Sequence, residues 1–168
     1  CPDKNIDKSI RLFSKIHKID NTSNFFIIGA DYGAKKNILE NIKKFGLKNS
    51  ISIIDYASFE EIKKYAKKAS FFIQLSSYEG MAMSVAESMQ LGLIPLVTNV
   101  GQIKIYCKNR QNAIIYNEND QEIIQYIFEL INSKEKFSNV RNSALATWRN
   151  SKIYKKDMIA AFDQVVNI

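Results

Sequence analysis

The most constraining feature of this sequence is a 35-residue stretch, from Ala69 to Ile103, with only two charged side chains, Glu79 and Glu87. The whole chain is 24% charged, so an even distribution would place about eight charges in those 35 residues. The stretch predicts a buried strand, a glycine-containing turn, an apolar helix and a second buried strand. A carboxylate in such surroundings loses hydration, which it must recover from a partner unless its pKa shifts. Glu79 and Glu87 are therefore the first candidates for functional side chains.

Short apolar runs alternate with amphipathic helical patterns along the rest of the chain, which is typical of a parallel α/β sheet. We expect strands at 25–28, 51–54, 71–75, 93–97 and 113–115, and helices at 5–19, 33–45, 60–68, 81–91, 120–132, 135–148 and 152–166. Ile38, Leu39 and Ile42 are expected to face inward, and Ser58 to cap a helix. The predicted fold class is α/β, a Rossmann-like doubly wound parallel sheet flanked by helices, in a single domain.

Doubly wound sheets bind their ligands at the carboxyl ends of their strands. The residues expected at that edge are Gly29, Asp55-Tyr56, Ser76-Ser77 and Thr98-Asn99. The order of the strands does not follow from the sequence.

Composition excludes several classes of site. No apolar run approaches the length of a membrane span, and the segment CPDKNIDKSIRLF lacks the shape of a signal peptide. Cys1 and Cys107 are too few and too scattered for a disulfide framework or a metal site, which favours a reduced, cytoplasmic setting. His17 is the single histidine, so neither a histidine-based metal site nor a Ser-His-Asp triad is expected.

The net charge of +7 has three candidate explanations: nucleic acid, an anionic membrane surface or a phosphate-bearing small ligand. The lysines are dispersed as pairs on the expected helix faces, for example Lys43-Lys44, Lys63-Lys64 and Lys67-Lys68. No basic stripe interleaved with aromatic residues accompanies them. Solvated helix surfaces account for each pair taken alone.

The turn from Ser76 to Gly80, followed by the expected helix, predicts an anion site. Free backbone amides and the helix dipole gather at such a helix start. Gly80 lets a phosphate or a sugar approach the main chain closely. Ionised Glu79 and Glu87 would accept paired hydrogen bonds from vicinal hydroxyls of a ribose or a pyranose. The alternative is structural: Glu79 complements the helix dipole and Glu87 reaches solvent.

The run SSYEGMAMSVAESMQLGLIPLVTNVG resembles the donor-site segment of retaining GT-B glycosyltransferases of family 4, the glycosyl transferases group 1. In that pattern S-x-x-E-G precedes a second Glu, eight residues after the first, and then Gly, Pro and a later Gly. The matching residues are Ser76, Glu79, Gly80, Glu87, Gly92, Pro95 and Gly101. PDKNID, FFIIGAD and KKYAKKASFFIQLSS resemble further segments of the family, so the resemblance covers nearly the whole chain.

The resemblance implies a role for each matching position. Glu79 would contact hydroxyls of the transferred sugar and Glu87 the hydroxyls of the ribose. Lys4 matches the family lysine that neutralises the diphosphate. The remaining donor-binding positions implied are the amides of Gly80, Met81 and Ala82, the motif residue Ser76, and the loop Tyr56-Ala57 at the base.

The implied reaction moves a hexose from a nucleotide diphosphate sugar to an acceptor hydroxyl, with the anomeric configuration kept, in polysaccharide or glycolipid synthesis. Glu79 and Lys4 are the implied catalytic residues, with Lys4 stabilising the leaving group and Glu79 positioning the sugar. No metal and no cofactor beyond the donor substrate is expected. The alternatives are a GT-B-like sugar-nucleotide epimerase and a non-catalytic nucleotide- or nucleic-acid-binding Rossmann domain.

The resemblance also implies partners that lie outside this chain. We expect residues 1–168 to be the C-terminal, donor-binding half of a GT-B enzyme, a fragment that lacks the N-terminal acceptor domain and is inactive by itself. The family's arginine would precede Cys1. A sugar or lipid-linked acceptor follows from the family, and nucleic acid does not. The implied location is the cytoplasm, with peripheral contact to the inner membrane face left open.

The sequence departs from the family pattern in three loops. Gly92 and Pro95 are separated by one more residue than usual, and Gly101-Gln102 replaces a Gly-Gly pair. The loop after the first expected strand reads Gly29-Ala30-Asp31-Tyr32-Gly33 instead of Gly-x-Gly-Pro. These changes affect the expected specificity for sugar and base more than the fold.

Overall fold

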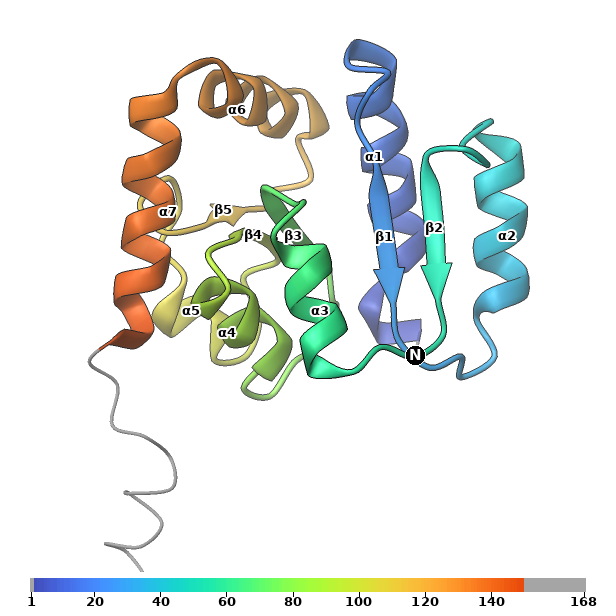
Figure 1. Ribbon diagram of the computed structural model, residues 1–168, viewed down its shortest axis with the longest axis horizontal. Helices are drawn as coiled ribbons and strands as arrows, with labels where there is room; N and C mark the ends of the chain where they lie inside the picture. Colours follow the sequence, from blue (N-terminus) through green and yellow to red (C-terminus); the bar gives the residue numbers. More distant parts are fainter. Residues whose placement is uncertain (1, 150–168) are drawn as a thin grey trace, which may run out of the picture.

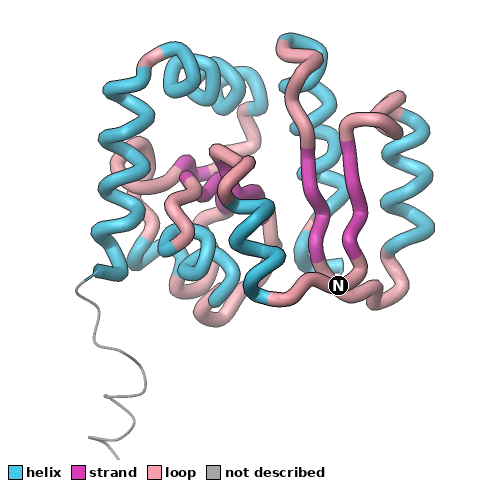
Figure 2. The backbone as a smooth tube through the Cα atoms, viewed as in Figure 1, coloured by secondary structure: helices cyan, strands magenta, loops and turns pink. Residues whose placement is uncertain are grey.

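The computed structural model describes residues 2–149. The strands are β1 (Phe25–Ile28), β2 (Ile51–Ile54), β3 (Phe71–Gln74), β4 (Ile94–Val97) and β5 (Ile114–Ile115). The helices are α1 (Ile6–Ile19), α2 (Lys35–Lys44), α3 (Phe59–Ala66), α4 (Met83–Gln90), α5 (Ile103–Tyr106), α6 (Asp120–Asn132) and α7 (Lys134–Arg149), preceded by a 3-10 turn, η1 (Pro2–Lys4). Strands and helices alternate as far as α6, as the tube in Figure 2 shows. The predicted α/β class is confirmed.

All strand pairs are parallel, but the strands form two groups. β1 pairs with β2, and β4 lies between β3 and β5. In Figure 1 the first group lies beside α1 and α2, the second beside α4 to α7, and α3 connects them. The expected single sheet is therefore divided between β1 and β3, which are not hydrogen-bonded to each other.

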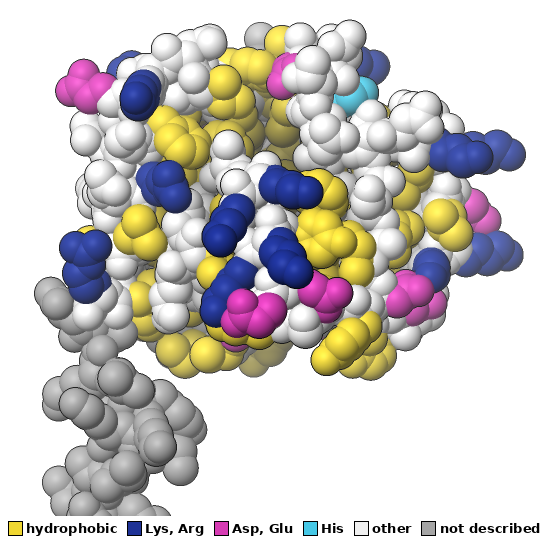
Figure 3. Space-filling view, in the orientation of Figure 1, with side chains coloured by type: hydrophobic (Ala, Val, Ile, Leu, Met, Phe, Trp, Pro, Cys, Tyr) yellow, Lys and Arg dark blue, Asp and Glu magenta, His cyan; other side chains and the backbone are white. Residues whose placement is uncertain are grey.

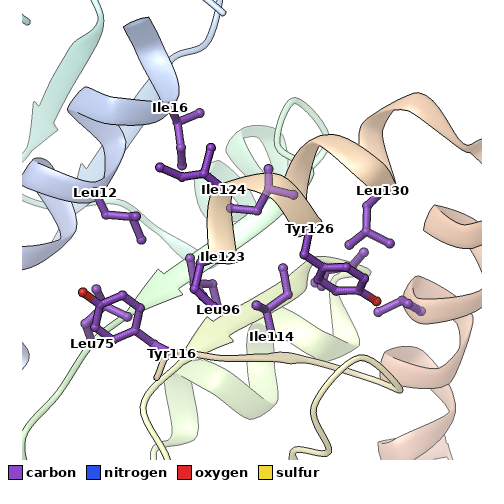
Figure 4. Packing of buried hydrophobic residues seen from close by; sticks show 13 residues of the cluster. Leu12, Ile16, Leu75, Leu96, Ile114, Tyr116, Ile123, Ile124, Tyr126 and Leu130 are labelled. Carbon is purple, nitrogen blue, oxygen red and sulfur yellow. The ribbon is translucent and has the colours of Figure 1, made fainter. Parts of the chain in front are cut away.

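Helix α1 joins the two groups because two of its faces are apolar. Ile10 and Phe13 are buried against α2 and the first group, and the Phe13 ring lies 5.3 Å from that of Phe25. Leu12 and Ile16 belong to the larger core of the second group. Figure 4 shows this core, in which α6 contributes one wall and strands β3 to β5 the floor; its labelled residues are Leu12, Ile16, Leu75, Leu96, Ile114, Tyr116, Ile123, Ile124, Tyr126 and Leu130.

Three expectations about elements are corrected or extended. Leu39 was expected to face inward but is 50% exposed, because Ile38 and Ile42, one helical turn apart, already fill the inner face of α2. The short helix α5 was not predicted, since four residues carry no periodic pattern. The helix expected at 152–166 lies outside the described residues.

The described surface is basic but mixed. Figure 3 shows Lys and Arg side chains scattered over one face, interrupted by uncharged and apolar groups and, on α3, by carboxylates. Lys63 pairs with Glu60 on α3, for example. Across residues 2–149, no helix is both long and apolar enough to cross a membrane.

Candidate functional site

The candidate site is the loop that leaves β3 and enters α4 at the carboxyl edge of the second strand group. Contacts from the chain after β4 hold this loop. The Thr98 hydroxyl donates to the Ser76 carbonyl (2.5 Å), and the Gln102 amide donates to the Gly80 carbonyl (3.0 Å). Gly101 lies so close that a Cβ there would sit 1.9 Å from the Glu79 carbonyl oxygen. The later glycine of the pattern is thus a packing requirement of the loop.

The amino end of α4 leaves a row of backbone amides free. The amides of residues 80–84 donate to no acceptor within the described part of the chain. The N-cap residue Ala82 has a left-handed backbone (φ 54°) and offers no side-chain cap. Such amides, together with the helix dipole, favour an anion. The amides predicted from the sequence, those of Gly80, Met81 and Ala82, belong to this row.

The neighbouring helix starts at the same edge are capped by side chains of the chain itself. The Asp31 carboxylate accepts from the amides of Gly33, Ala34 and Lys35 at the start of α2 (2.8, 2.9 and 3.1 Å). Ser58 and Glu61 form a reciprocal capping box on α3, as the sequence predicted for Ser58. An external anion at α2 or α3 would therefore meet a carboxylate, Asp31 or Glu61, whereas no side chain caps the start of α4.

Glu79 is buried, with 9% of its surface exposed, and its partners converge on one oxygen. Lys4 Nζ lies 2.5 Å and Gln74 Nε2 2.8 Å from Oε1. Oε2 accepts no hydrogen bond from any described residue. The carboxylate is thus charge-paired through Oε1 and keeps Oε2 for another donor. The alternative in which Glu79 only complements the helix does not account for this pairing.

Lys4 reaches Glu79 because the chain before α1 is fastened to the loop after β3. The Ser77 amide donates to the Asp3 carbonyl (2.8 Å). The Asn5 side-chain amide donates to the Leu75 carbonyl (2.9 Å) and to the Ser77 hydroxyl (2.7 Å). Lys4 and Glu79, which the resemblance assigned to the diphosphate and the sugar of the donor, are 75 residues apart in the chain but in direct contact.

Glu87 lies on α4 but does not have the buried environment that its sequence context suggested. Its side chain is exposed and has no hydrogen-bonding or ionic partner within the described part of the chain. The apolar residues around it, Val85, Ala86 and Met89, point into the core instead. The expectation that Glu87 is buried is wrong, because helical periodicity turns position 87 outward.

Tyr56 and Ala57, the predicted base contact, lie in the loop after β2. Tyr56 is 83% exposed. Beside it Asp55 accepts two hydrogen bonds from Lys35 Nζ (2.7 and 2.6 Å). The hollow at this edge lies over β1 and β2 and not at Glu79; it is lined by Ile6, Ile27, Ile28, Gly29, Ala30, Asp31, Tyr32, Ala34, Lys35, Ile38, Ile53 and Asp55.

Ser76 and Met81 occupy opposite environments. Ser76 is fully buried, and its hydroxyl is the one buried side-chain polar atom without a partner in the region that the structure describes. Met81 is half exposed, and its carbonyl accepts from the Tyr106 hydroxyl (2.8 Å). Burial raises the pKa of Tyr106, so this hydroxyl remains a donor at neutral pH.

Sequence reasoning missed the residues that support the loop, namely Gln74, Ser84, Asn5 and Tyr106. Gln74 carried a signal: it is the polar residue in the strand Phe71–Gln74, whose other members are apolar. A buried amide in such a strand requires hydrogen-bonding partners. Ser84 and Tyr106 carried no signal, because their partners are distant in sequence.

The arrangement can bind an anion and a set of hydroxyls side by side. The amides at the start of α4 and the Lys4 ammonium supply positive potential, and Glu79 Oε2 supplies an acceptor. No group of three or more His, Cys, Asp or Glu side chains in residues 2–149 is placed to hold a metal ion.

Comparison with known proteins identifies relatives of one kind. The family model described as "Glycosyl transferases group 1" matches residues 2–146. A GDP-mannose:cellobiosyl-diphosphopolyprenol alpha-mannosyltransferase of Xanthomonas oryzae is 22% identical over 146 residues, 85% of this chain and 38% of the relative. An uncharacterised glycosyltransferase of Methanocaldococcus jannaschii is 30% identical over 138 residues, 80% of this chain and 36% of the relative. The chain thus spans well under half the length of these relatives.

Solved structures share the fold. The C-terminal domain of the glycosyl transferase group 1 family protein LpcC from Francisella tularensis superposes with a TM-score of 0.77 at 18% identity, covering 90% of this chain and 80% of that domain. Anabaena HepE, in complex with UDP and glucose, gives a TM-score of 0.81 at 16% identity over 98% of this chain and 45% of HepE.

Proposed function

The chain belongs to the glycosyl transferases group 1 family, and on that premise we propose that it is the donor-binding domain of a retaining hexosyltransferase with a GT-B fold. The donor is a nucleotide diphosphate sugar, and the product belongs to a polysaccharide or glycolipid. One observation carries the proposal: free amides at the start of α4 lie beside a buried glutamate, Glu79, that is charge-paired through one oxygen and open at the other.

The donor occupies the carboxyl edge in four parts. Its diphosphate lies on the amides of residues 80–84, within reach of the Lys4 ammonium, which has three N–H donors and uses one on Glu79. The hexose places hydroxyls on Glu79 Oε2. The ribose hydroxyls bind Glu87, whose exposed and unpartnered carboxylate is available for them. The base lies against the Tyr56-Ala57 loop.

Transfer forms a bond between the hexose C1 and the acceptor oxygen and breaks the bond between C1 and the phosphate oxygen. The bonding electrons leave with the nucleotide diphosphate, which takes up the proton that the acceptor hydroxyl loses. This domain contributes electrostatic stabilisation of the departing diphosphate, through Lys4 and the start of α4. Glu79 is assigned to holding the sugar and not to nucleophilic attack, because Glu79 and Glu87 do not resemble the two opposed carboxylates of a glycoside hydrolase.

The proposals for the nucleotide, the acceptor domain and the cellular location draw on the relatives. The names of two similar proteins mention GDP-mannose and UDP with glucose, which supports a nucleotide sugar and leaves the base open. An N-terminal domain that binds a sugar or lipid-linked acceptor, a cytoplasmic location and contact with the inner membrane face are proposed for the whole protein. No cofactor beyond the donor is proposed.

Saturation-transfer NMR of this chain with UDP-glucose, GDP-mannose, ADP-glucose and a CMP-sugar tests the proposal. We expect transfer to the ribose and base of one donor and at least a tenfold weaker affinity in Glu87→Gln and in Glu79→Gln, because each loses a charged acceptor. Glu40→Gln is the matched control, since Glu40 is also an exposed, unpartnered carboxylate on a helix. Equal binding by all four proteins would refute the site.

A further inference from the structure

We propose that Gln74 is a positioning residue that fixes the Glu79 carboxylate so that Oε2, and not Oε1, receives the donor sugar. The inference rests on the proposed function and assigns a role to a side chain outside the S-x-x-E-G pattern. Gln74 is the last residue of β3 and is only 7% exposed. It does not touch the proposed donor and acts through Glu79.

The contacts of Gln74 join the two halves of the candidate site. Its amide nitrogen donates to Glu79 Oε1 (2.8 Å), and its amide oxygen accepts from the Ser84 hydroxyl (2.7 Å). Ser84 lies in the first turn of α4, among the free amides. A single side chain therefore connects the glutamate proposed for the sugar with the helix start proposed for the diphosphate.

The chemistry of the groups leaves one arrangement of this network. An ionised carboxylate only accepts, so the NH2 end of the Gln74 amide must face Glu79. The amide oxygen then faces Ser84, whose hydroxyl must donate. Lys4 and Gln74 both use Oε1, so the open lone pairs of Glu79 are those of Oε2.

A hydrocarbon at position 74 would fit the strand but not the network. Phe71, Phe72 and Ile73 show that β3 accepts apolar side chains, and Leu75 next in the chain is fully buried. Position 74 carries an amide although a buried polar group contributes to stability only when it is hydrogen-bonded. The loop after β3 stays attached through Thr98 and Gln102. Loss of the amide should therefore free the Glu79 side chain without unfolding the loop.

The test is Gln74→Met, which keeps the length of an unbranched side chain and removes both hydrogen bonds. Calorimetric titrations use UDP against UDP-glucose and GDP against GDP-mannose. We expect Gln74→Met to weaken binding of the nucleotide sugar about tenfold and to change binding of the bare nucleotide less than twofold, because Glu79 is proposed to touch only the sugar. Ser84→Ala should show the same selectivity at a smaller magnitude.

Each outcome decides between the inference and its premise. The positioning role is overturned if Gln74→Met weakens binding of the nucleotide and of the nucleotide sugar equally. It is also overturned if Gln74→Met leaves the binding of both unchanged. If Glu79→Gln leaves the difference in affinity between the nucleotide sugar and the bare nucleotide unchanged, the proposed function of Glu79 fails instead. A ligand-free measurement accompanies them: hydrogen exchange of the Gln74 side-chain amide should be slow in the wild type and fast in Glu79→Ala. Exchange at the rate of a free amide in the wild type would also overturn the inference.

Discussion

At the scale of single residues, the shape of the site depends on a glycine that makes no contact with the proposed ligand. Gly101 has a left-handed backbone (φ +52°), and the carbonyl oxygens of Glu79 and Gly80 would lie 1.9 and 2.7 Å from a Cβ at that position. Both neighbours are backbone atoms, so they cannot yield as a flexible side chain would. The later glycine of the family pattern, Gly101, is thus explained by packing.

Gly101→Ala should therefore displace the loop that carries Glu79. We expect it to lower the free energy of unfolding by at least ~1 kcal/mol and to shift the NMR amide signals of residues 79–84. Gly46→Ala is the matched control, because Gly46 also has a positive φ (+70°) but nothing within 4 Å of an added Cβ. Unchanged loop signals in Gly101→Ala would contradict the packing.

The sequence points to Glu79, Lys4 and Glu87 as candidates, but it does not describe their surroundings. The contact between Lys4 and Glu79 depends on Asn5 and Ser77, whose partners are far apart in the chain. The exposure of Glu87 depends on which face of α4 packs inward. Resemblance gives the position of a residue in a pattern, whereas its partners follow only from tertiary contacts.

At the scale of elements, periodicity predicted most of the strands and helices, and it failed where a pattern was short or ambiguous. α5 has four residues, too few for a repeat, and Leu39 shares the apolar character of Ile38 but not its direction. The starts of α3 and α6 are better specified, because Ser58 and Asn119 cap these helices through their own side chains.

The start of α6 provides a pH-dependent contact between elements. Asp120 accepts from Lys15 on α1 (2.7 Å) and from the Tyr116 hydroxyl (2.7 Å). Partial burial by itself would raise the pKa of Asp120, but these hydrogen bonds and the nearby cations outweigh it, and the pKa lies below its usual value. The resulting contribution to the free energy of unfolding is fully present above the pKa of Asp120 in the unfolded chain, near 3.8. It is lost as the pH falls through the pKa of Asp120 in the folded protein.

Asp120→Asn should remove this contribution. We expect a loss of ~1 kcal/mol in the free energy of unfolding at pH 7 and a shallower decline of stability below pH 4 than in the wild type. Urea unfolding between pH 2.5 and 7 measures both. Asp7→Asn, which changes an exposed aspartate on α1 without a partner among the residues described, serves as the control. Parallel pH profiles for wild type and Asp120→Asn would contradict the assignment.

At the scale of the whole molecule, the alternation of strands and helices predicted a parallel α/β domain, and the structure confirms that class. The division of the strands into two groups joined through α1 was not predictable. Local periodicity indicates where strands lie, whereas tertiary packing decides which strands pair. The two groups nevertheless place the loops after β2 and β3 and the segment before α1 at the edge where a donor would lie.

The most direct test of the proposed donor site is to locate where a nucleotide sugar binds on this chain. Backbone amide NMR spectra recorded during titration with UDP-glucose and GDP-mannose provide that location. We expect the largest shifts on residues 80–84, with smaller shifts near Glu87 and the Tyr56-Ala57 loop and none on α7. Shifts centred instead on the capped start of α2, or spread over the lysine pairs of the helix surfaces, would contradict the proposed donor site.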